Sequence, residues 1–196
     1  LLRAHARNRP DTPALRQKRF GIWNELTWAE YERAVNHFAQ GLIALGYGRG
    51  DHVAILSENR QEWLIAELGM QMVGAVAAGV YPTSPAPEIQ HVLDLTEAKA
   101  IVCEDQEQVD KVLEIKDQLP NLRHIIYFDG RGLAGYDVPN LVAYSALMET
   151  GAKAAQSDPG FLDRALRDHD PDDVALIVGT SGSTGLPKAA LITYRN

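Results

Sequence analysis

The sequence predicts an α/β fold with layered helices and a mostly parallel sheet. Apolar, strand-like runs alternate with amphipathic, helix-like segments between residues 28 and 128. These strand-like runs are apolar at nearly every position, which is typical of parallel strands covered by helices on both faces. With 196 residues, 45% of them hydrophobic and 23% charged, the chain is long enough and ordinary enough in composition to bury a core.

The first long helix is predicted to begin after Thr27. Thr27 and Glu30 have capping-box spacing, in which a hydroxyl and a carboxylate satisfy the free N–H groups of the first turn. Apolar residues then recur three or four positions apart, and Gly46 can end the helix in a left-handed conformation. The residues on this apolar face are Trp28, Tyr31, Val35, Phe38, Leu42 and Leu45.

Two strands and two helices are expected next. Residues 51–56 form a short apolar strand, and Asn59 is expected to cap a buried helix over residues 60–72. Residues 74–82 give the next strand, which Pro82 ends, and Pro87 opens a further helix. That helix has an apolar side with Ile89, Val92, Leu93 and Thr96, and a polar side with Glu88, His91 and Asp94.

The remaining alternation predicts a strand at 100–103, a helix and a strand at 124–128. The apolar positions of the helix are Val109, Val112, Leu113 and Leu119. Residues 129–170 are richer in Gly and Asp and contain a short helix near residues 144–148. We therefore expect a first α/β subdomain over residues 1–150, and a linker with the start of a second subdomain over residues 151–196.

Charge and cysteine content exclude several classes of protein. A net charge of −7 without any basic stripe argues against a nucleic-acid-binding surface. The only cysteine, Cys103, lies in an apolar run and is expected to be buried, so that the chain fits a reducing, cytoplasmic compartment. No segment is long and apolar enough to span a bilayer, and residues 1–10 lack the core of a signal peptide. Peripheral membrane association remains open.

Other groups of residues are better explained by structure than by chemistry. The acidic run 167–174 lacks the Gly and Glu positions of a calcium loop, and the six histidines show no zinc-binding spacing, so that no metal site is predicted. Trp23, Trp28 and Trp63 are expected to pack in the core. Residues 81–84 follow a strand end and either line a substrate cleft or form a plain turn.

The segment GTSGSTGLPK, residues 179–188, is the strongest candidate for a binding site. Seven of its ten residues are Gly, Ser or Thr, and apolar strand-like runs precede and follow it. Glycine backbone N–H groups can converge on one anion, hydroxyls add short donors, and Lys188 adds a positive charge. The segment therefore suits a polyphosphate, although a flexible loop with a solvated lysine has the same composition.

The segment is not a Walker A loop. In that motif Lys directly follows the second Gly and precedes Ser or Thr, whereas here Leu186 and Pro187 intervene and Ala189 follows the lysine. Residues 189–193 are expected to form a strand rather than a helix, so that the donors must come from the loop itself.

Residues 180–188 resemble the signature loop of the AMP-forming, adenylate-forming superfamily. This superfamily includes acyl-CoA synthetases, luciferases and the adenylation domains of peptide synthetases. Its usual pattern continues with Gly and, after a strand, with His; here Ala189 and Tyr194 stand at these positions. Residues 26–83 are similar to the family's amino-terminal portion, and residues 80–104 look most like the long-chain fatty acyl-CoA synthetase branch.

The resemblance implies the amino-terminal part of the adenylate-forming enzyme fold. It also implies an ATP-dependent ligase that converts a fatty acid, of the long-chain type, to an acyl-adenylate and then to acyl-CoA, releasing pyrophosphate and AMP. Mg²⁺ and CoA would be required. The β- and γ-phosphates would be bound by Thr180, Ser181, Gly182, Ser183, Thr184, Gly185 and Lys188, with Lys188 also stabilising the pyrophosphate as a catalytic residue.

The same resemblance places other functional residues after Asn196, among them the glutamate that holds Mg²⁺ and the lysine that activates the carboxylate. We therefore expect these 196 residues alone to be inactive. Two alternatives remain open: an acyl-AMP ligase that delivers to a carrier protein, and a nucleotide- or acyl-binding module without catalysis.

Overall fold

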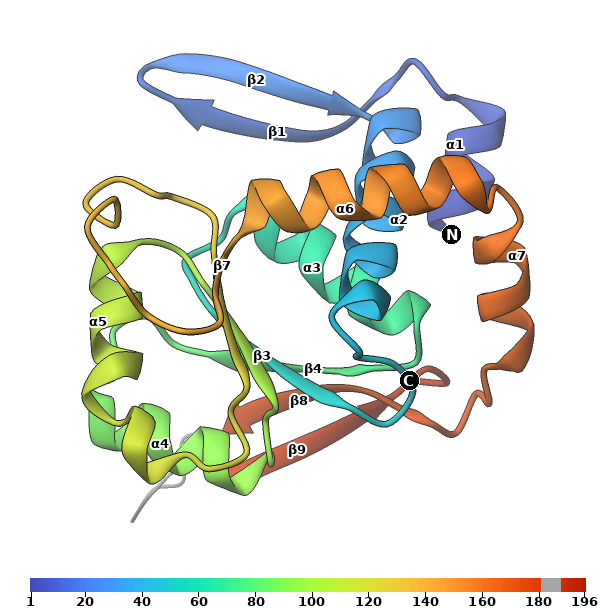
Figure 1. Ribbon diagram of the computed structural model, residues 1–196. Coiled ribbons are helices and arrows are strands. Elements are labelled where there is room, and N and C mark those ends of the chain that lie inside the picture. Colours follow the sequence, from blue (N-terminus) through green and yellow to red (C-terminus); the bar gives the residue numbers. More distant parts are fainter. Residues whose placement is uncertain (181–187) are drawn as a thin grey trace.

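The computed structural model describes residues 1–180 and 188–196 (Figure 1). The order along the chain is helix α1 (Leu2–Asn8), strands β1 (Pro13–Arg19) and β2 (Ile22–Thr27), α2 (Trp28–Ala44), β3 (His52–Leu56), α3 (Gln61–Met72), β4 (Val76–Val80), α4 (Ala86–Leu95), β5 (Ala100–Cys103), α5 (Gln106–Glu114), the 3₁₀ turn η1 (Lys116–Gln118), β6 (His124–Tyr127), β7 (Leu141–Ala143), α6 (Tyr144–Ser157), α7 (Phe161–Ala165), η2 (Leu166–Asp168), β8 (Val174–Thr180) and β9 (Lys188–Thr193). The predicted α/β class is confirmed.

Seven strands form one sheet in the order β7-β6-β5-β3-β4-β8-β9. All neighbours are parallel except β8 and β9, which are antiparallel, and β9 is an edge strand of the sheet. At the centre, Ala54 of β3 lies opposite Ala78 of β4 and Ile101 of β5. All three residues are almost completely buried, as the uniformly apolar runs predict.

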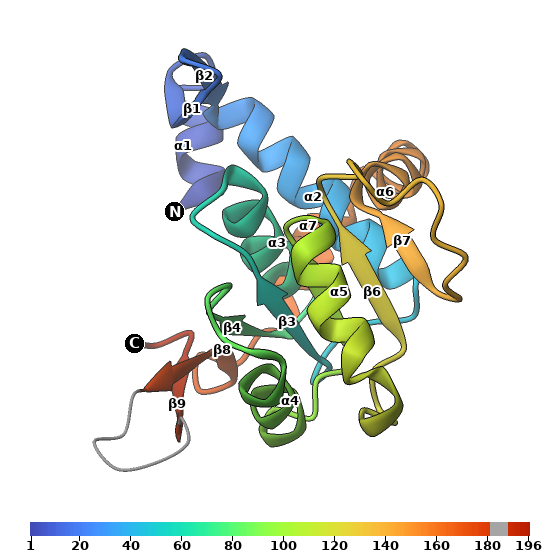
Figure 2. The ribbon, with the colours of Figure 1, turned by 90° about the vertical axis from the view of Figure 1, so that its left-hand side faces the viewer.

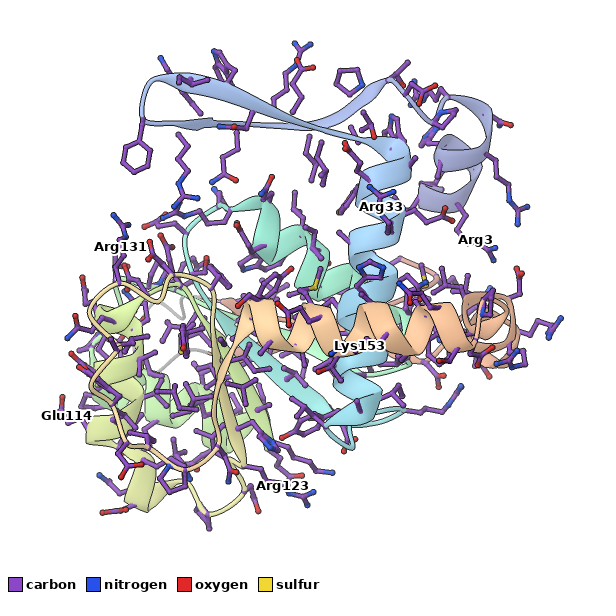
Figure 3. The ribbon with its side chains drawn as sticks, turned by 45° about the horizontal axis from the view of Figure 1, so that its top comes forward. Arg3, Arg33, Glu114, Arg123, Arg131 and Lys153 are labelled. Atoms are coloured by element: carbon purple, nitrogen blue, oxygen red, sulfur yellow. The ribbon has the colours of Figure 1, made fainter. Side chains whose placement is uncertain are left out.

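Helices cover both faces of the sheet (Figures 1 and 2). Helices α2, α3 and α6 contribute to one apolar cluster, which includes Phe38, Met70 and Leu147. Helices α4 and α5 contribute to the cluster on the other face, which includes Ile89 and Val109. Charged side chains such as Glu114, Arg123 and Lys153 are exposed on the outside of these layers (Figure 3).

The predicted boundaries of α2 are confirmed by its end groups. The Thr27 hydroxyl accepts a hydrogen bond from the Glu30 N–H at 3.3 Å, and the Glu30 carboxylate accepts one from the Thr27 N–H at 2.9 Å. At the other end, Gly46 adopts a φ of +87°, which only glycine tolerates without strain. The capping box and the terminal glycine therefore define this helix as the sequence indicates.

Helix α6 is much longer than the short helix expected near residues 144–148, because its close packing on α2 stabilises the extra turns. A Cβ atom at Gly151 would lie 1.7 Å from the His37 carbonyl oxygen, and one at Gly41 would lie 2.6 Å from the Leu147 carbonyl oxygen. Two glycines thus allow the two helices to cross almost in backbone contact. Glycine is a weak helix former, so that this tertiary contact was not visible in local sequence patterns.

Several finer expectations are wrong. Asn59 does not cap α3; Arg60 occupies the N-cap position. Helix α5 ends at Glu114, and Leu119 packs in the core after a separate 3₁₀ turn. Trp23 is 62% exposed on β2 rather than buried, because the β1–β2 hairpin pairs only with itself and lies outside the main sheet. Trp28 and Trp63 are half-buried and pack against the core.

Candidate functional site

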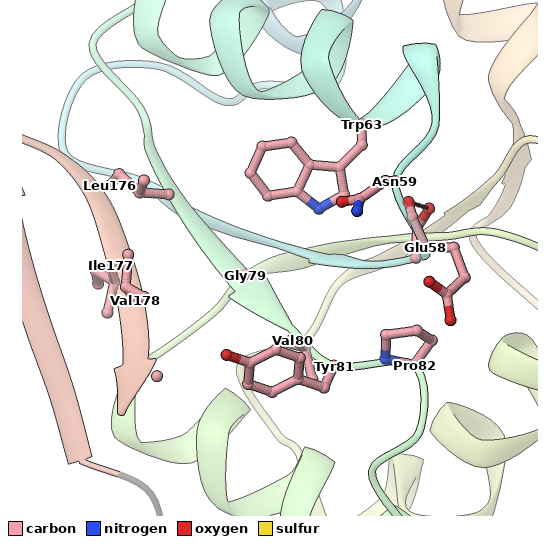
Figure 4. Close-up of a pocket in the computed structure, with 12 residues that line it drawn as sticks. Glu58, Asn59, Trp63, Gly79, Val80, Tyr81, Pro82, Leu176, Ile177 and Val178 are labelled. Carbon is pink, nitrogen blue, oxygen red and sulfur yellow. Dashed lines mark hydrogen bonds between the residues drawn. The ribbon is translucent and has the colours of Figure 1, made fainter. Parts of the chain in front are cut away.

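A cavity of about 380 Å³ opens at the carboxyl ends of strands β3, β4 and β8. Most of its lining comes from the connection after β3, from the end of β4 and from β8, and Trp63 of α3 closes it from above (Figure 4). The lining residues are Ser57, Glu58, Asn59, Trp63, Gly79, Val80, Tyr81, Pro82, Leu176, Ile177, Val178 and Gly179. Its size is within the range of small-molecule and cofactor sites.

The cavity lies at the point where the connections of the sheet change direction. Helix α3 leaves β3 toward one face, while α4 leaves the neighbouring β4 toward the opposite face. The two connections diverge and leave a crevice between the strand ends, which is where open α/β sheets bind ligands. The topology therefore explains why the cavity exists at the carboxyl ends of these strands.

One wall of the cavity, residues 57–63, is held by a buried carboxylate. Glu104 directly follows β5 and is only 7% exposed. It accepts hydrogen bonds from the Glu58 N–H at 2.8 Å, from the Ser57 hydroxyl at 3.3 Å and from the Arg60 guanidinium Nε at 2.8 Å. A second guanidinium nitrogen of Arg60 also contacts Glu104, and this carboxylate raises the pKa of Arg60 through hydrogen bonding and charge attraction. We call residues 57–63 the anchored wall.

The floor of the cavity is bare backbone beside an aromatic ring. A Cβ atom at Gly79 would lie 3.7 Å from the Trp63 ring, its only neighbour within 4 Å, and one at Gly179 would have no neighbour within that distance. Glycine at these positions keeps space open between β4 and β8. The Tyr81 ring lies on the other side of the opening and is 66% exposed (Figure 4).

The opposite wall is formed by β8, which pairs with β9 on its far side, and the predicted phosphate-binding segment joins these two strands. Thr180 and Lys188 pair directly across the ladder, and the Thr180 hydroxyl donates a hydrogen bond to the Lys188 carbonyl at 3.2 Å. The segment therefore begins at the carboxyl end of β8, where the cavity also lies. Lys188 itself lines a shallow depression beside Gly179 and Thr96 rather than the large cavity. We call residues 176–180 and 188–193 the β8–β9 wall.

Five of the predicted phosphate-binding residues, Ser181, Gly182, Ser183, Thr184 and Gly185, lie outside the described residues. The two that flank them, Thr180 and Lys188, are described and adjacent. Their roles stay predictions. The apolar run after the segment forms β9 but is not buried: Leu191 is 60% exposed, because β9 is an edge strand of the described sheet.

Both explanations of residues 81–84 hold in part. Tyr81 and Pro82 line the cavity, whereas the Ser84 N–H bonds to the Tyr81 carbonyl at 3.0 Å and closes a tight turn. The turn directs the chain from β4 into α4, and the first two residues face the opening.

Tyr194 has a structural contact at the end of β9 that is remote from the cavity. Its hydroxyl donates a hydrogen bond to the Gln71 carbonyl at 2.8 Å, and burial raises the pKa of Tyr194 to about 12. Thr193, the preceding residue, pairs with Val174 at the amino end of β8. Tyr194 therefore links β9 to the end of α3. It lies beside the amino end of β8, whereas Gly179 lies near the carboxyl end of that strand.

The acidic run before β8 forms ion pairs. Asp172 binds Arg195 at 2.6 Å, and Asp173 binds Arg49. Within the described parts of the chain, no cluster of His, Cys, Asp and Glu side chains could hold a metal ion. Cys103 is fully buried, and burial raises the pKa of its thiol.

The anchored wall is the main part of the site that sequence reasoning missed. The available signal was the position of two polar residues, Ser57 and Glu104, directly after fully apolar strands that turn out to be neighbours. A carboxylate at the carboxyl end of a central parallel strand lies beside the connections of its neighbours, where backbone N–H groups lack partners.

A mostly parallel sheet with a cavity at the carboxyl ends of its strands is typical of α/β proteins that bind ligands at this position. The family comparison is more specific. The chain belongs to the family of AMP-binding enzymes, whose model matches residues 2–196.

Curated relatives of this chain are long-chain-fatty-acid–CoA ligases. The chain is 33% identical over 186 residues to ACSBG2 of Xenopus laevis, covering 95% of this chain and 24% of that protein. It is 34% identical over 192 residues to FadD15 of Mycobacterium tuberculosis, covering 98% of this chain and 30% of that protein. The chain thus spans less than a third of the length of these relatives.

Solved structures share the fold. Acetoacetyl-CoA synthetase from Streptomyces lividans matches with a TM-score of 0.75 and 28% identity over 98% of this chain and 29% of that one. A fatty acyl CoA synthetase of Mycobacterium tuberculosis matches with a TM-score of 0.73 and 23% identity over 98% of this chain and 34% of that one, which shows the fold alone. Among the described helices, none is long and apolar enough to cross a membrane.

Proposed function

We propose that this chain is part of an ATP-dependent, AMP-forming ligase that activates a long-chain fatty acid and transfers it to CoA. The observation that carries the proposal is the position of the Gly- and Ser-rich connection. This connection follows the carboxyl end of β8, where the cavity also lies, and the chain belongs to the AMP-binding enzyme family. The relatives named as long-chain-fatty-acid–CoA ligases support the choice of substrate.

A carboxylate is a poor acyl donor because its leaving group would be an oxide ion. In the proposed reaction a carboxylate oxygen attacks the α-phosphorus of ATP, and pyrophosphate leaves with the electron pair of the broken P–O bond. The thiol of CoA then attacks the acyl carbon, loses its proton and displaces AMP. The protein must hold two anions together while negative charge develops on the departing pyrophosphate.

Within this chain, the proposed phosphate donors are Thr180, Ser181, Gly182, Ser183, Thr184, Gly185 and Lys188. Lys188 would counter the charge on the leaving pyrophosphate. The described residues by themselves provide no cluster for Mg²⁺, and Glu104 is already engaged by Arg60, so that no step is assigned to the metal. We also propose that the protein is cytoplasmic and that a boundary between two subdomains lies near residue 150.

The test is pyrophosphate release by the full-length protein, measured with carboxylic acids of graded length and with and without CoA. Release that requires a long-chain acid and yields acyl-CoA is the expected result. An acyl-adenylate that forms but does not react with CoA would indicate delivery to a carrier protein. Nucleotide binding without pyrophosphate release would indicate a binding module. The 196-residue chain alone should show no turnover.

A further inference from the structure

The β1–β2 hairpin projects over the start of α3 (Figure 1), and two small polar cavities lie between the hairpin and the body of the protein. The larger has a volume of about 160 Å³ and the smaller about 70 Å³. Three charged side chains line both cavities: Arg19 of the hairpin, and Arg60 and Glu62 of the body. Asp129 also lines the smaller one. Charged groups of both signs therefore meet in this space.

Two of these four charged groups are already neutralised by partners in the body. The Arg60 Nε donates a hydrogen bond to Glu104 at 2.8 Å. Asp129 accepts one from the Arg131 Nε at 2.9 Å, and the hydrogen bonds of this guanidinium lower the pKa of Asp129 to about 2. Neither Arg60 nor Asp129 needs a ligand to balance its charge.

Arg19 and Glu62 have no such partners. Within the described parts of the chain, neither side chain makes a hydrogen bond or an ion pair, and the Arg19 guanidinium lies 5.5 Å from the centre of the Phe20 ring. Glu62 is half-buried, and its Oε2 atom is buried without a hydrogen-bond partner. Buried polar atoms nearly always have a partner, so that this carboxylate is under-satisfied. Two opposite charges thus line one cavity without pairing with each other.

A ligand that suits these two charges carries both a cation and an anion. An ammonium group can pair with Glu62, and a carboxylate can accept two parallel hydrogen bonds from Arg19. The larger cavity, of about 160 Å³, equals about five water molecules at ~30 Å³ each, which is enough for the charged end of a small zwitterion. Arg19 is exposed, so that such a ligand can enter from solvent.

An apolar space adjoins these charges. A third cavity, of about 240 Å³, shares part of its lining with the larger polar cavity. The shared residues are Gln17, Arg60 and Gln61. The apolar part of the third cavity is formed by Leu15, Trp63 and Leu64. Arg16 also lines it but pairs with Glu25 at 2.7 Å. A zwitterion held by the two unpaired charges can therefore extend an apolar side chain into this space.

We propose that the space between the hairpin and the start of α3 binds a free α-amino acid with an apolar side chain. Its ammonium group pairs with Glu62, its carboxylate pairs with Arg19, and its side chain packs beside Trp63. Residues 60–63 belong to the anchored wall, so that the bound amino acid contacts both the hairpin and this wall. The proposal does not depend on the ligase activity.

The experiment is isothermal titration calorimetry of the full-length protein with L-leucine, without ATP. Leucine should bind saturably, at one site per chain. Three analogues each lack one feature: N-acetylleucine lacks the ammonium charge, leucinamide the carboxylate and glycine the apolar side chain. Each should bind at least about tenfold more weakly, because a hydrogen bond to a charged group or a buried apolar side chain contributes that much to affinity. Absence of saturable leucine binding, or an analogue that binds as tightly as leucine, would overturn the proposal.

Two variants locate the binding. Arg19→Gln and Glu62→Gln should each weaken leucine binding at least about tenfold. Neither should lose stability in urea denaturation, because neither side chain has a partner in the described structure. Glu107→Gln is the matched control, since its carboxylate is exposed on α5 and paired with Lys111, and it should bind leucine as the wild type does.

The competing explanation is that Arg19 and Glu62 pair directly with each other in solution. In that case both single variants would be less stable than the wild type, and the double variant would be no less stable than either of them. That result, or leucine binding that is unchanged in both single variants, would overturn the proposal.

Discussion

The two walls of the cavity are built in different ways. The anchored wall, residues 57–63, is fixed by one buried carboxylate, Glu104, which joins a neighbouring strand to the beginning of α3. The β8–β9 wall is held mainly by its antiparallel ladder, and its outer residues Val178, Leu191 and Ile192 are between 36% and 60% exposed. One wall depends on a buried polar network, and the other carries the segment proposed to bind phosphate.

This difference indicates a division of roles. Substitutions in the anchored wall should alter stability first, because they disturb polar groups that share one buried carboxylate, Glu104. Substitutions in the β8–β9 wall should alter ligand binding or rate with little effect on folding, because its side chains are largely solvated. Single substitutions in each wall and in the layer behind them test this division.

The largest effect on stability is expected for Glu104→Ala. The change leaves Arg60, the Ser57 hydroxyl and the Glu58 N–H without their shared acceptor, which should cost about 4 kcal/mol of unfolding free energy. Glu107→Ala is the matched control, because Glu107 is also ion-paired, to Lys111, but its side chain is 70% exposed. Urea denaturation measures both. Equal losses in the two variants would show that the anchored wall has no special network.

Gly151→Ala should cost about 3 kcal/mol, because the new methyl group would meet the His37 backbone and force α6 away from α2. This helix pair packs in the same apolar cluster as α3, so that the change tests whether the layer behind the anchored wall is rigid. Gly135→Ala is the control, since a Cβ atom there would have no neighbour within 4 Å. A loss for Gly151→Ala no greater than that of the control would contradict this close contact.

A smaller effect on the free energy of unfolding, which depends on pH, is expected from His124 on β6. Burial, followed by the charge of Arg123, lowers the pKa of His124 below its usual 6.5. The unfolded chain therefore binds a proton at a higher pH than the folded chain does. The contribution of His124 to the free energy of unfolding is therefore fully present above about pH 6.5. It declines as the pH falls toward the pKa of His124 in the folded state. His124→Gln should reduce this decline in denaturation curves between pH 7 and pH 5; an unchanged decline would assign it to other groups, such as His37.

The smallest effect is expected for Leu191→Ser on β9. This side chain is 60% exposed in the described structure, so that the change should cost no more than about 0.5 kcal/mol. The measurement is again urea denaturation, now compared with Leu93→Ser on the buried face of α4. A large loss at Leu191 would show that the β8–β9 wall is covered in the full-length protein and would weaken the comparison.

Sequence patterns predicted the core of the fold well, because its strands and helices are defined by local chemistry. The capping box at Thr27 and the apolar run at 100–103 are examples. Features that depend on distant contacts were missed or misplaced. Helix α6 is stabilised by a glycine contact with α2, and the hairpin that exposes Trp23 is fixed by Gln17 capping α3.

The candidate site shows the same division. The segment predicted to bind phosphate could be proposed from sequence because its small residues and lysine follow one another along the chain. The anchored wall was not, because its members are separated by more than 40 positions and meet only when β3 and β5 pair. A single buried carboxylate gives no local pattern that distinguishes it from a solvated one.

The central claim is that the segment joining β8 and β9 binds the phosphates of ATP. It is tested most directly by fatty-acid-dependent exchange of labelled pyrophosphate into ATP, catalysed by full-length Lys188→Ala. The rate should fall about 100-fold, as expected when one charged donor to a developing anion is removed, while stability is retained. Lys153→Ala, on the exposed side of α6, should exchange at the wild-type rate. Exchange by Lys188→Ala at the wild-type rate would contradict the claim.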